Sequence, residues 1–317
     1  MKALTFIPPA SGTGRPVLEH IELPAPQPRK GEVLVRVHHA ALNNFDLETS
    51  RGERNKAIRR DAKKNPVLSG IEMAGVAESD GVRIKAGDPV FGYTNIFKGP
   101  WFHAQQVALS ESKMARVPEN FSLEGAASII GGALTSIAAL ERIAKLKSGS
   151  KLLVTGATGS VGVTATQLAT HLGATVSAVC HSSQLDFARA EGASEAYAYD
   201  RDELPEAAHQ FDVVFDTAPS LSFVTAQKFL SRRGCYVPTM PHQDVSGFLR
   251  ALFSRRKWGF LLESDTDETR MERLRTLMSQ GAFRTAIDSI HTLARATDAF
   301  ARQEERGKHG KILIDFG

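Results

Sequence analysis

The sequence predicts an α/β protein in which a doubly wound parallel sheet is joined to a β-rich domain. Two patterns carry this prediction. From about Ser122 onward, short apolar runs alternate with helical stretches, as parallel βαβ units require. Before that point, short β-like runs are separated by Gly and Pro, which is typical of a barrel-like β domain. A chain of 317 residues is long enough for two such domains around a shared cleft.

The β-rich domain is predicted over residues 1–122. Apolar and polar residues alternate in Glu32–Val37, as they do in a half-buried antiparallel strand. The opening Met1–Pro9 reads as an edge strand ended by prolines. Further strands are expected at Gly75–Ala77 and Asp88–Tyr93.

The doubly wound domain is predicted over residues 123–281, and residues 282–317 are expected to return to the first domain. The last helix should run from Asp267 to Gln280 and end at Gly281. The other expected helices are Ser160–Leu172, Gln184–Glu191, Leu221–Ser231 and Val245–Arg255. The expected strands are Lys151–Thr155, Thr175–Cys180, Ala196–Tyr199, Phe211–Asp216, Gly234–Pro238, Trp258–Leu262, Ala286–Ile290 and Lys311–Asp315.

The composition is that of an ordinary soluble protein, with 42% hydrophobic and 23% charged residues. No apolar run reaches the 18 or so residues that span a bilayer, and the start is not a signal peptide. We therefore expect a cytoplasmic protein without a membrane partner. Cys180 and Cys235 cannot build a disulfide framework, and we expect both to be buried in strands.

The net charge of +4 raises the question of a nucleic-acid partner. The positive residues are scattered, apart from the clusters 59–64 and Arg255–Lys257, and the segment Arg51–Lys64 is expected to be an exposed loop or short helix. Short clusters of this kind are usually solvated surface, so we expect no nucleic-acid partner.

The most specific motif is a glycine turn between an apolar strand and an amphipathic helix, Leu152–Gly162. Glycines at this turn let backbone N–H groups approach a pyrophosphate, and the helix N-terminus adds a favourable dipole. The alternative is an ordinary glycine turn of an α/β protein. The residues predicted to bind a dinucleotide here are Gly156, Thr158, Gly159, Ser160, Val161 and Gly162.

The end of the second strand indicates which dinucleotide is bound. An NAD site places a carboxylate there, but this chain has no acid before Asp186. His181, Ser182 and Ser183 follow the strand, and the two serines could donate hydrogen bonds to a 2′-phosphate; alternatively, Ser183 only caps the next helix. We favour NADPH over NADH.

Several phrases of the sequence resemble the medium-chain dehydrogenase/reductase superfamily, and they occur in that superfamily's order. The resemblance implies a GroES-like catalytic domain packed on a Rossmann domain, with the nicotinamide in the cleft between them. It also implies a homodimer formed through the edge of the Rossmann sheet near Trp258–Leu262. The phrases that carry it are Gly31–Val37, Ala40–Asp46, Ser69–Gly75, Gly87–Gly92, Gly131–Thr135, Thr155–Gly162 and Gly310–Ile314.

The departures from the superfamily point to its zinc-independent quinone-reductase branch. Asn43 stands where zinc alcohol dehydrogenases carry a cysteine ligand, and Ile71 replaces a histidine ligand. An amide and an alkyl group cannot replace thiolate and imidazole around zinc, so we expect no metal. The cysteine-rich structural lobe is absent as well.

Similarity to quinone reductases implies roles for individual residues. Asn43 would lie beside the nicotinamide, Thr135 would approach it, Tyr199 would lie near the 2′-phosphate, and Arg306 would lie near the cofactor. Two positions differ from that branch: Gln184 replaces a basic residue and Glu48 replaces a tyrosine.

Other residues have both a functional and a structural interpretation. Tyr93 and Trp101 could border the cleft, or they could fill the rim of the barrel. Asp46 and Glu72 resemble an acid–base pair, but the matching positions of the superfamily are mainly structural. The apolar cluster of Phe248, Phe253 and Trp258 could cover the substrate, although a core or dimer contact is the better reading.

Together these features predict an NADPH-dependent oxidoreductase that transfers a hydride to a quinone or an α,β-unsaturated carbonyl without zinc. Asn43 and Tyr93 would steady the substrate's carbonyl oxygen, and water is one candidate proton source. The alternatives are a zinc-independent NAD(P)-dependent alcohol dehydrogenase and a non-catalytic NADPH-binding redox sensor.

Overall fold

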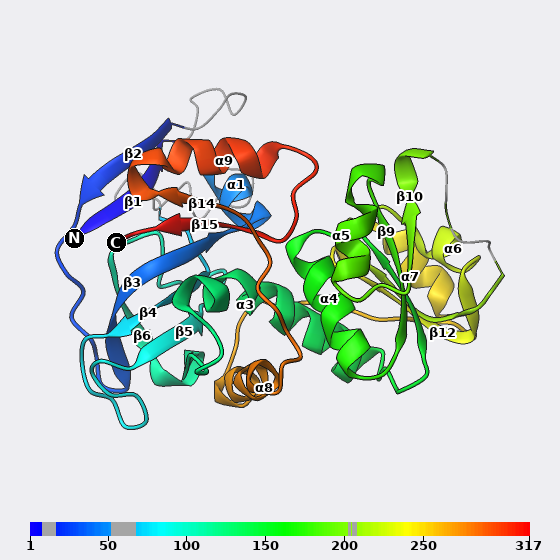
Figure 1. Cartoon of the computed structure of the whole chain (residues 1–317), viewed down its shortest axis with the longest axis horizontal. Helices are drawn as coiled ribbons and strands as arrows, with labels where there is room; N and C mark the ends of the chain where they lie inside the picture. The colour runs from blue at the N-terminus through cyan, green and yellow to red at the C-terminus, as the bar shows by residue number, and fades with distance from the viewer. Residues whose placement is uncertain (8–16, 52–67, 202–203, 205–207) are drawn as a thin grey trace.

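The computed structural model describes residues 1–7, 17–51, 68–201, 204 and 208–317. It has two lobes side by side (Figure 1), one formed by both ends of the chain and one by its middle. The first basic cluster, 59–64, and the charged segment that follows Arg51 lie outside the described residues.

The first lobe is built on an open, mainly antiparallel sheet that the C-terminal segment completes, with β14 and β15 paired in parallel. Its strand order is β14-β15-β3-β4-β5-β7, with β6 paired to β3. A separate hairpin of β1 (Lys2–Ile7) and β2 (Val17–Glu22) packs on this lobe. The strands of the main sheet are β3 (Glu32–Leu42), β4 (Glu72–Ala77), β5 (Pro89–Tyr93), β6 (Gln106–Ser110), β7 (Met114–Arg116), β14 (Ile287–Thr292) and β15 (Lys311–Asp315).

The register between the last strand and β3 is important for the site. β15 runs antiparallel to β3 and pairs Ile312 with Leu42. One step further along, Lys311 therefore comes beside Asn43. The chain reaches this point after α9 (Ala296–Glu304), which packs on β14 and β15.

The second lobe contains a six-stranded parallel sheet of order β10-β9-β8-β11-β12-β13. Because the strand order reverses at β8, the carboxyl ends of β8 and β11 border the crevice where doubly wound folds bind their ligands. The strands are β8 (Lys151–Thr155), β9 (Thr175–Cys180), β10 (Glu195–Ala198), β11 (Phe211–Asp216), β12 (Leu230–Pro238) and β13 (Lys257–Trp258). The helices of this part are α4 (Ser160–His171), α5 (Leu185–Ala190), α6 (Phe223–Ala226) and α7 (Val245–Ala251). A further helix, α8 (Glu268–Ser279), packs on β7 and α3 beside the first lobe.

Three predicted elements of this lobe have the wrong extent. The helix expected over Leu221–Ser231 is a single turn, α6, because buried Phe229 and Leu230 join the core and Leu230 already begins β12. The helix expected over Val245–Arg255 ends at Ala251. The strand expected over Trp258–Leu262 ends at Trp258, because the chain then leaves the sheet for the first lobe, where the Ser264 carbonyl accepts from the Ile96 N–H. Tertiary contacts decide the boundaries of α6 and β13.

A helix that the sequence analysis missed connects the lobes. α3 (Leu123–Ile137) continues into a π-helical segment, Ala138–Ile143, and packs against β3, β4, β5 and α4. Among the described residues this run alone is long and apolar enough to cross a membrane, with a hydropathy of 1.5. However, 78% of that window is buried inside the protein, as in the core helix of a soluble fold.

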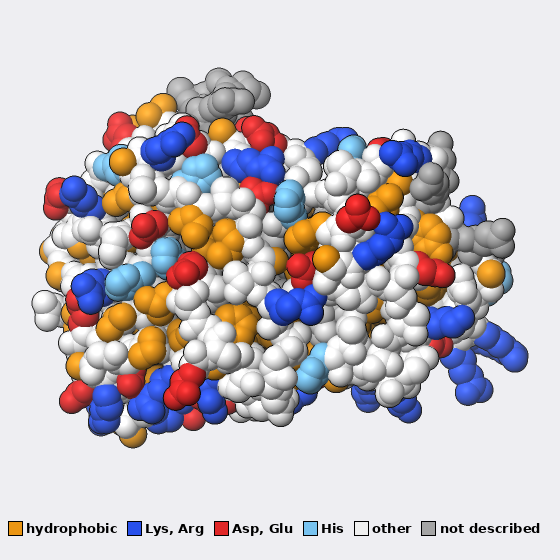
Figure 2. Space-filling model, in the orientation of Figure 1, with side chains coloured by type: hydrophobic (Ala, Val, Ile, Leu, Met, Phe, Trp, Pro, Cys, Tyr) orange, Lys and Arg blue, Asp and Glu red, His pale blue; other side chains and the backbone are white. Residues whose placement is uncertain are grey.

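Charged side chains are distributed without a dominant sign on the face of the first lobe in Figure 2, where red and blue intermingle. Cys180 and Cys235 are free and buried in β9 and β12, as predicted.

Candidate active site

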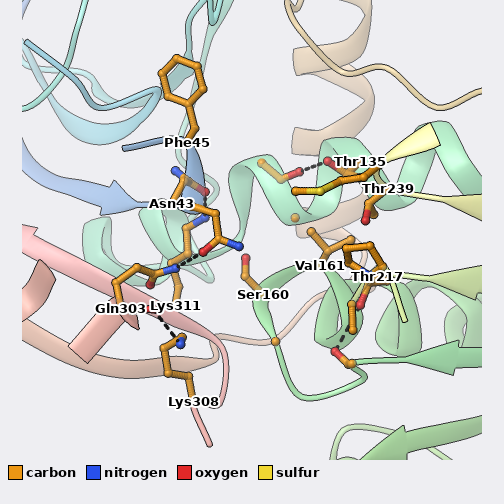
Figure 3. Close-up of a pocket in the computed structure, with 18 of the residues that line it drawn as sticks. Asn43, Phe45, Thr135, Ser160, Val161, Thr217, Thr239, Gln303, Lys308 and Lys311 are labelled. Carbon is orange, nitrogen blue, oxygen red and sulfur yellow. Dashed lines mark hydrogen bonds between the residues drawn. The ribbon is translucent and has the colours of Figure 1, made fainter. Parts of the chain in front are cut away.

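A cleft of about 1710 Å³ is lined by residues of both lobes. Of the residues predicted to form the site, all but Gly162, Ser182 and Ser183 line it. Figure 3 shows its central part, where side chains from the β-rich lobe face the glycine turn. Residues that sequence reasoning missed also line the cleft: Thr217, Thr239, Gln303, Lys308 and Lys311.

The glycine turn has the shape that a pyrophosphate requires. Gly156 follows β8 with a φ of 60°, a conformation that L side chains rarely adopt. A Cβ on Gly162 would overlap the carbonyl oxygen of Gly156, so only glycine lets helix α4 approach the strand this closely. Gly159, the N-cap of α4, has no side chain that could satisfy the first N–H groups of the helix, and these remain available to an anion.

Two buried polar atoms face each other across the cleft. Asn43 Nδ2 from the first lobe and Ser160 Oγ from the start of α4 have no hydrogen-bond partner among the described residues. Figure 3 shows the two side chains pointing toward one another. Because a buried donor or hydroxyl without a partner costs about 1–3 kcal/mol, such groups at a cleft indicate a place where a ligand binds.

The Asn43 carboxamide is held by a charged network at the bottom of the cleft. Lys311 Nζ donates to Asn43 Oδ1 at 2.6 Å and to Glu72 Oε1 at 2.8 Å. The other oxygen of Glu72 accepts from the Gly131 N–H of α3 at 2.8 Å. The Asn43 backbone N–H donates to Asp46 Oδ2 at 2.7 Å, which closes a capping box on α1 (Asn44–Ser50). Asp46 and Glu72 therefore bind the protein's own groups, as their structural reading expected.

A carboxylate that the sequence did not indicate lies beside the far end of the cleft, next to the lining residues His181 and Tyr199. Asp200, which follows β10, accepts hydrogen bonds from both the backbone N–H and the hydroxyl of Ser182, each at 2.7 Å. These bonds hold the pKa of Asp200 below its usual range. His181 and the half-exposed Tyr199 line the cleft beside this pair, with their rings edge to face. Ser183 bonds to the His181 ring rather than pointing into the cleft.

Gln184 joins the glycine turn to the C-terminal segment. Its side-chain oxygen accepts from Thr158 Oγ1 at 2.9 Å, and its nitrogen donates to the Lys308 carbonyl at 2.9 Å. The Gly310 N–H also donates to the Thr158 carbonyl at 2.8 Å. The segment that contains Lys308, with neighbouring Arg306, thus lies against the dinucleotide loop.

The two aromatic candidates, Tyr93 and Trp101, lie in different positions relative to the cleft. Tyr93 lines the cleft but is almost fully buried, and its hydroxyl donates to the Glu263 carbonyl at 3.2 Å. Burial raises its pKa well above the ordinary value, so the hydroxyl stays protonated. Trp101 does not line the cleft; it stacks behind Phe45, with ring centroids 6.0 Å apart. Thr135 lines the cleft, and its hydroxyl donates to the Gly131 carbonyl at 2.6 Å.

The residues at the catalytic-zinc position of zinc alcohol dehydrogenases do not fit that metal. Asn43 and Ile71 offer an amide and an alkyl group, and Glu72 is already paired with the Lys311 ammonium. The buried Lys311 ammonium would repel a zinc ion placed at this position. No three His, Cys, Asp or Glu side chains come together to hold a metal in the described part of the chain.

Comparison with known proteins decides the family. Residues 29–147 match the model of the alcohol dehydrogenase GroES-like domain, and residues 191–314 match that of the zinc-binding dehydrogenases. The chain is 30% identical to the chloroplast envelope quinone oxidoreductase homolog of Arabidopsis thaliana, over 96% of this chain and 95% of that protein. The chain belongs to the quinone-oxidoreductase-like branch of the medium-chain dehydrogenase/reductase superfamily.

Other members of the superfamily are similar over most of their length. The structure of the quinone oxidoreductase from Coxiella burnetii aligns with a TM-score of 0.85 at 26% identity, covering 100% of this chain and 99% of that one. The NADPH-dependent alkenal/one oxidoreductase of Arabidopsis thaliana is 26% identical over 91% of this chain and 73% of its own. These matches confirm the predicted family and the combination of a GroES-like domain with a Rossmann domain.

Proposed function

We propose that the chain is an NADPH-dependent oxidoreductase that transfers a hydride to a quinone or an α,β-unsaturated carbonyl without zinc. The observation that carries the proposal is the Asn43 NH₂ group, which has no hydrogen-bond partner among the described residues and faces the dinucleotide loop across the cleft. The names of two relatives, a quinone oxidoreductase homolog and an NADPH-dependent alkenal/one oxidoreductase, support the same chemistry.

The chain's own residues bind and orient the reactants. The free N–H groups at the start of α4 bind the pyrophosphate, while Ser160 and Thr135 border the space for the nicotinamide. The bound reduced nicotinamide supplies the hydride. The Asn43 NH₂ group donates to the acceptor's carbonyl oxygen as that oxygen gains negative charge. Tyr93 is a second candidate donor, but its hydroxyl would first have to leave the Glu263 carbonyl.

The choice of acceptor follows from the absence of suitable zinc ligands at the site. Without a Lewis acid, an alkoxide formed from a simple alcohol has little electrostatic support. Quinones and enones delocalise the negative charge that arrives with the hydride. The Asn43 amide and the nearby Lys311 ammonium can therefore suffice to stabilise it. For this reason we favour them over the alcohol dehydrogenase alternative.

The NADPH preference is supported by the residues after β9, where no carboxylate follows the strand directly and His181 and Tyr199 line the cleft. Asp200 acts against this preference, because its carboxylate is charged and occupies the Ser182 donors. We therefore expect NADPH to be preferred, but only modestly.

The deciding experiment is steady-state oxidation of NADPH and NADH, in parallel, by the purified chain with a panel of quinones, enones, aldehydes and alcohols. Turnover with quinones or enones supports the proposal, and turnover with alcohols alone supports the dehydrogenase alternative. If the chain binds NADPH tightly but reduces no acceptor, the result supports the alternative of a non-catalytic redox sensor. Elemental analysis of the active enzyme tests the zinc claim, because stoichiometric zinc would contradict it.

We also propose that the chain forms a homodimer through the edge of the Rossmann sheet. β13 is the last strand of that sheet, and Phe260 and Leu262, which follow it, are exposed. Phe248 packs on Trp258 with ring centroids 5.0 Å apart, while Phe253 is 94% exposed. An open edge with apolar neighbours favours pairing with a second copy. Light scattering of the wild type and of Leu262→Glu tests this: the substitution should yield monomers.

A further inference from the structure

Lys311 is an unusual residue to find at the bottom of a cleft. Its side chain is only 4% exposed and that of Glu72 only 1%, although both carry a charge. Burying a charge is costly unless it is paired and hydrogen-bonded, and here the two groups pair at 2.8 Å. Such a pair contributes little net stability compared with apolar residues, which suggests that it serves another purpose.

The chemistry of the ammonium group determines how the Asn43 amide is turned. An ammonium group donates hydrogen bonds and accepts none, so only the oxygen of the carboxamide can face Lys311 Nζ. This contact is 2.6 Å long. The NH₂ end must therefore point the other way, into the cleft toward Ser160, where Figure 3 places it.

The capping box of α1 acts on the same end of the amide, because the Asp46 backbone N–H is directed at the Asn43 side chain. Lys311 adds a charged donor to that oxygen, at 2.6 Å. Nδ2 has no partner among the described residues. Glu72 in turn holds the ammonium, and it is fixed through the Gly131 N–H.

We propose that Lys311 is a positioning residue for the reaction: it sets the orientation of the Asn43 amide, so that the cleft presents a hydrogen-bond donor to the acceptor's carbonyl oxygen. This inference rests on the proposed function. The C-terminal strand thereby contributes to the site without touching the substrate, through a residue 268 positions away from Asn43 in the chain.

The test is a double-mutant cycle with a charge-neutral pair of substitutions. Lys311→Met alone would leave the Glu72 carboxylate buried and unpaired, so it is combined with Glu72→Gln. This pair is introduced into the wild type and into Asn43→Ala. We expect kcat with a quinone or enone to fall about 10- to 100-fold in the wild-type background, the effect of losing one charge-assisted hydrogen bond. In the Asn43→Ala background it should fall less than about twofold, because residues that act through one another are not additive.

Equal losses of kcat in the two backgrounds would overturn the inference, because Lys311 would then act independently of Asn43. An unchanged kcat in the wild-type background would also overturn it. NADPH affinity, measured by fluorescence, and the unfolding temperature identify variants that are merely damaged. A positioning role predicts NADPH affinity within about twofold of wild type.

A spectroscopic readout keeps the inference separate from the proposed function. The Asn43 side-chain amide signals in a ¹H–¹⁵N spectrum are identified by their loss in Asn43→Ala. They should shift in the Glu72→Gln/Lys311→Met variant, and unchanged signals would overturn the inference. If the wild type consumes no NADPH with any acceptor, the proposed function fails, while these signals still decide whether Lys311 orients the amide.

Discussion

Lys311 Nζ lies 2.6 Å from Asn43 Oδ1, so a cation from the last strand fixes the amide that faces the dinucleotide loop. The antiparallel register of β15 and β3 creates this contact. The C-terminal strand thereby contributes to a cleft that is also lined by residues from the start and the middle of the chain.

Removing the Asn43 amide should slow turnover more than it weakens coenzyme binding. We expect Asn43→Ala to lower kcat about 10- to 100-fold, because the lost donor acts on charge that develops during the reaction. The KM for NADPH should stay within about threefold of the wild-type value, since binding depends mainly on the α4 N-terminus. Asn120→Ala is a matched control, because that amide bonds to the Met278 carbonyl outside the cleft. An unchanged kcat in Asn43→Ala would remove the assignment.

Two glycines of the turn should respond differently to alanine. In Gly162→Ala the new methyl overlaps the Gly156 carbonyl, so both the unfolding temperature and NADPH affinity should fall. At Gly159 the φ of −74° suits alanine, and the nearest atom to a new Cβ is 3.5 Å away. Gly159→Ala should therefore keep wild-type stability and lose NADPH affinity, because the methyl obstructs the close approach of the pyrophosphate. Differential scanning fluorimetry and fluorescence titration measure the two effects.

Asp200 should limit the preference for NADPH. Its pKa lies below the ordinary value, chiefly because of the Ser182 hydrogen bonds, so it is charged at neutral pH and repels a 2′-phosphate. We expect Asp200→Asn to raise the ratio of kcat/KM for NADPH to that for NADH by about tenfold, the effect of roughly one charge contact. Asp186→Asn is the control, because it removes an exposed carboxylate that pairs with Arg189 and not with Ser182. If both variants shift the ratio equally, the effect is not specific to Asp200.

His103 should make the fold sensitive to acid. Its ring is fully buried, with Nδ1 bonded to Ser69 Oγ at 2.7 Å, and burial lowers its pKa. The unfolded chain therefore binds this proton first as the pH falls below about 6.5, and the free energy of unfolding drops by up to about 1.4 kcal/mol per pH unit. Above that pH the histidine contributes no pH dependence.

Urea unfolding at pH 7.5 and pH 5.5 measures this effect. The variant Ser69→Ala/His103→Phe lacks the buried ring nitrogens and their partner, so its loss of stability between the two pH values should be smaller than in the wild type. His20→Gln, which removes an exposed histidine, is the control. Identical losses in the wild type and the double variant would contradict the role of His103.

The features that could be predicted from the sequence have local causes. The glycine turn of Gly156 to Gly162 was recognised because strand, turn and helix follow one another directly, and every requirement of the turn lies within a few residues. The departures at Asn43 and Ile71 were visible for the same reason, since each lies in a short phrase that resembles the superfamily. Helix α3 was missed because it is buried on most sides and lacks a polar stripe.

The features that could not be predicted arise where strands meet. Asp200 reaches Ser182 because β10 lies beside β9 in the sheet, although the sequence between them showed only the absence of an acid after β9. β13 ends earlier than predicted because the chain crosses there to the first lobe, where the Ser264 carbonyl accepts from the Ile96 N–H. Neither the contact of Asp200 with Ser182 nor the length of β13 can be predicted from residues that are adjacent in the sequence.

By itself, the sequence determined the two-domain α/β architecture, the dinucleotide turn and the family, because these depend on periodicity and short motifs. Only the tertiary structure decided which atoms face the cleft. Asn43, Glu72 and Lys311 come from three separate segments, and the pairing of β3, β4 and β15 brings them together. Once there, the need to compensate a buried charge fixes their hydrogen bonds, and with them the direction of the Asn43 amide.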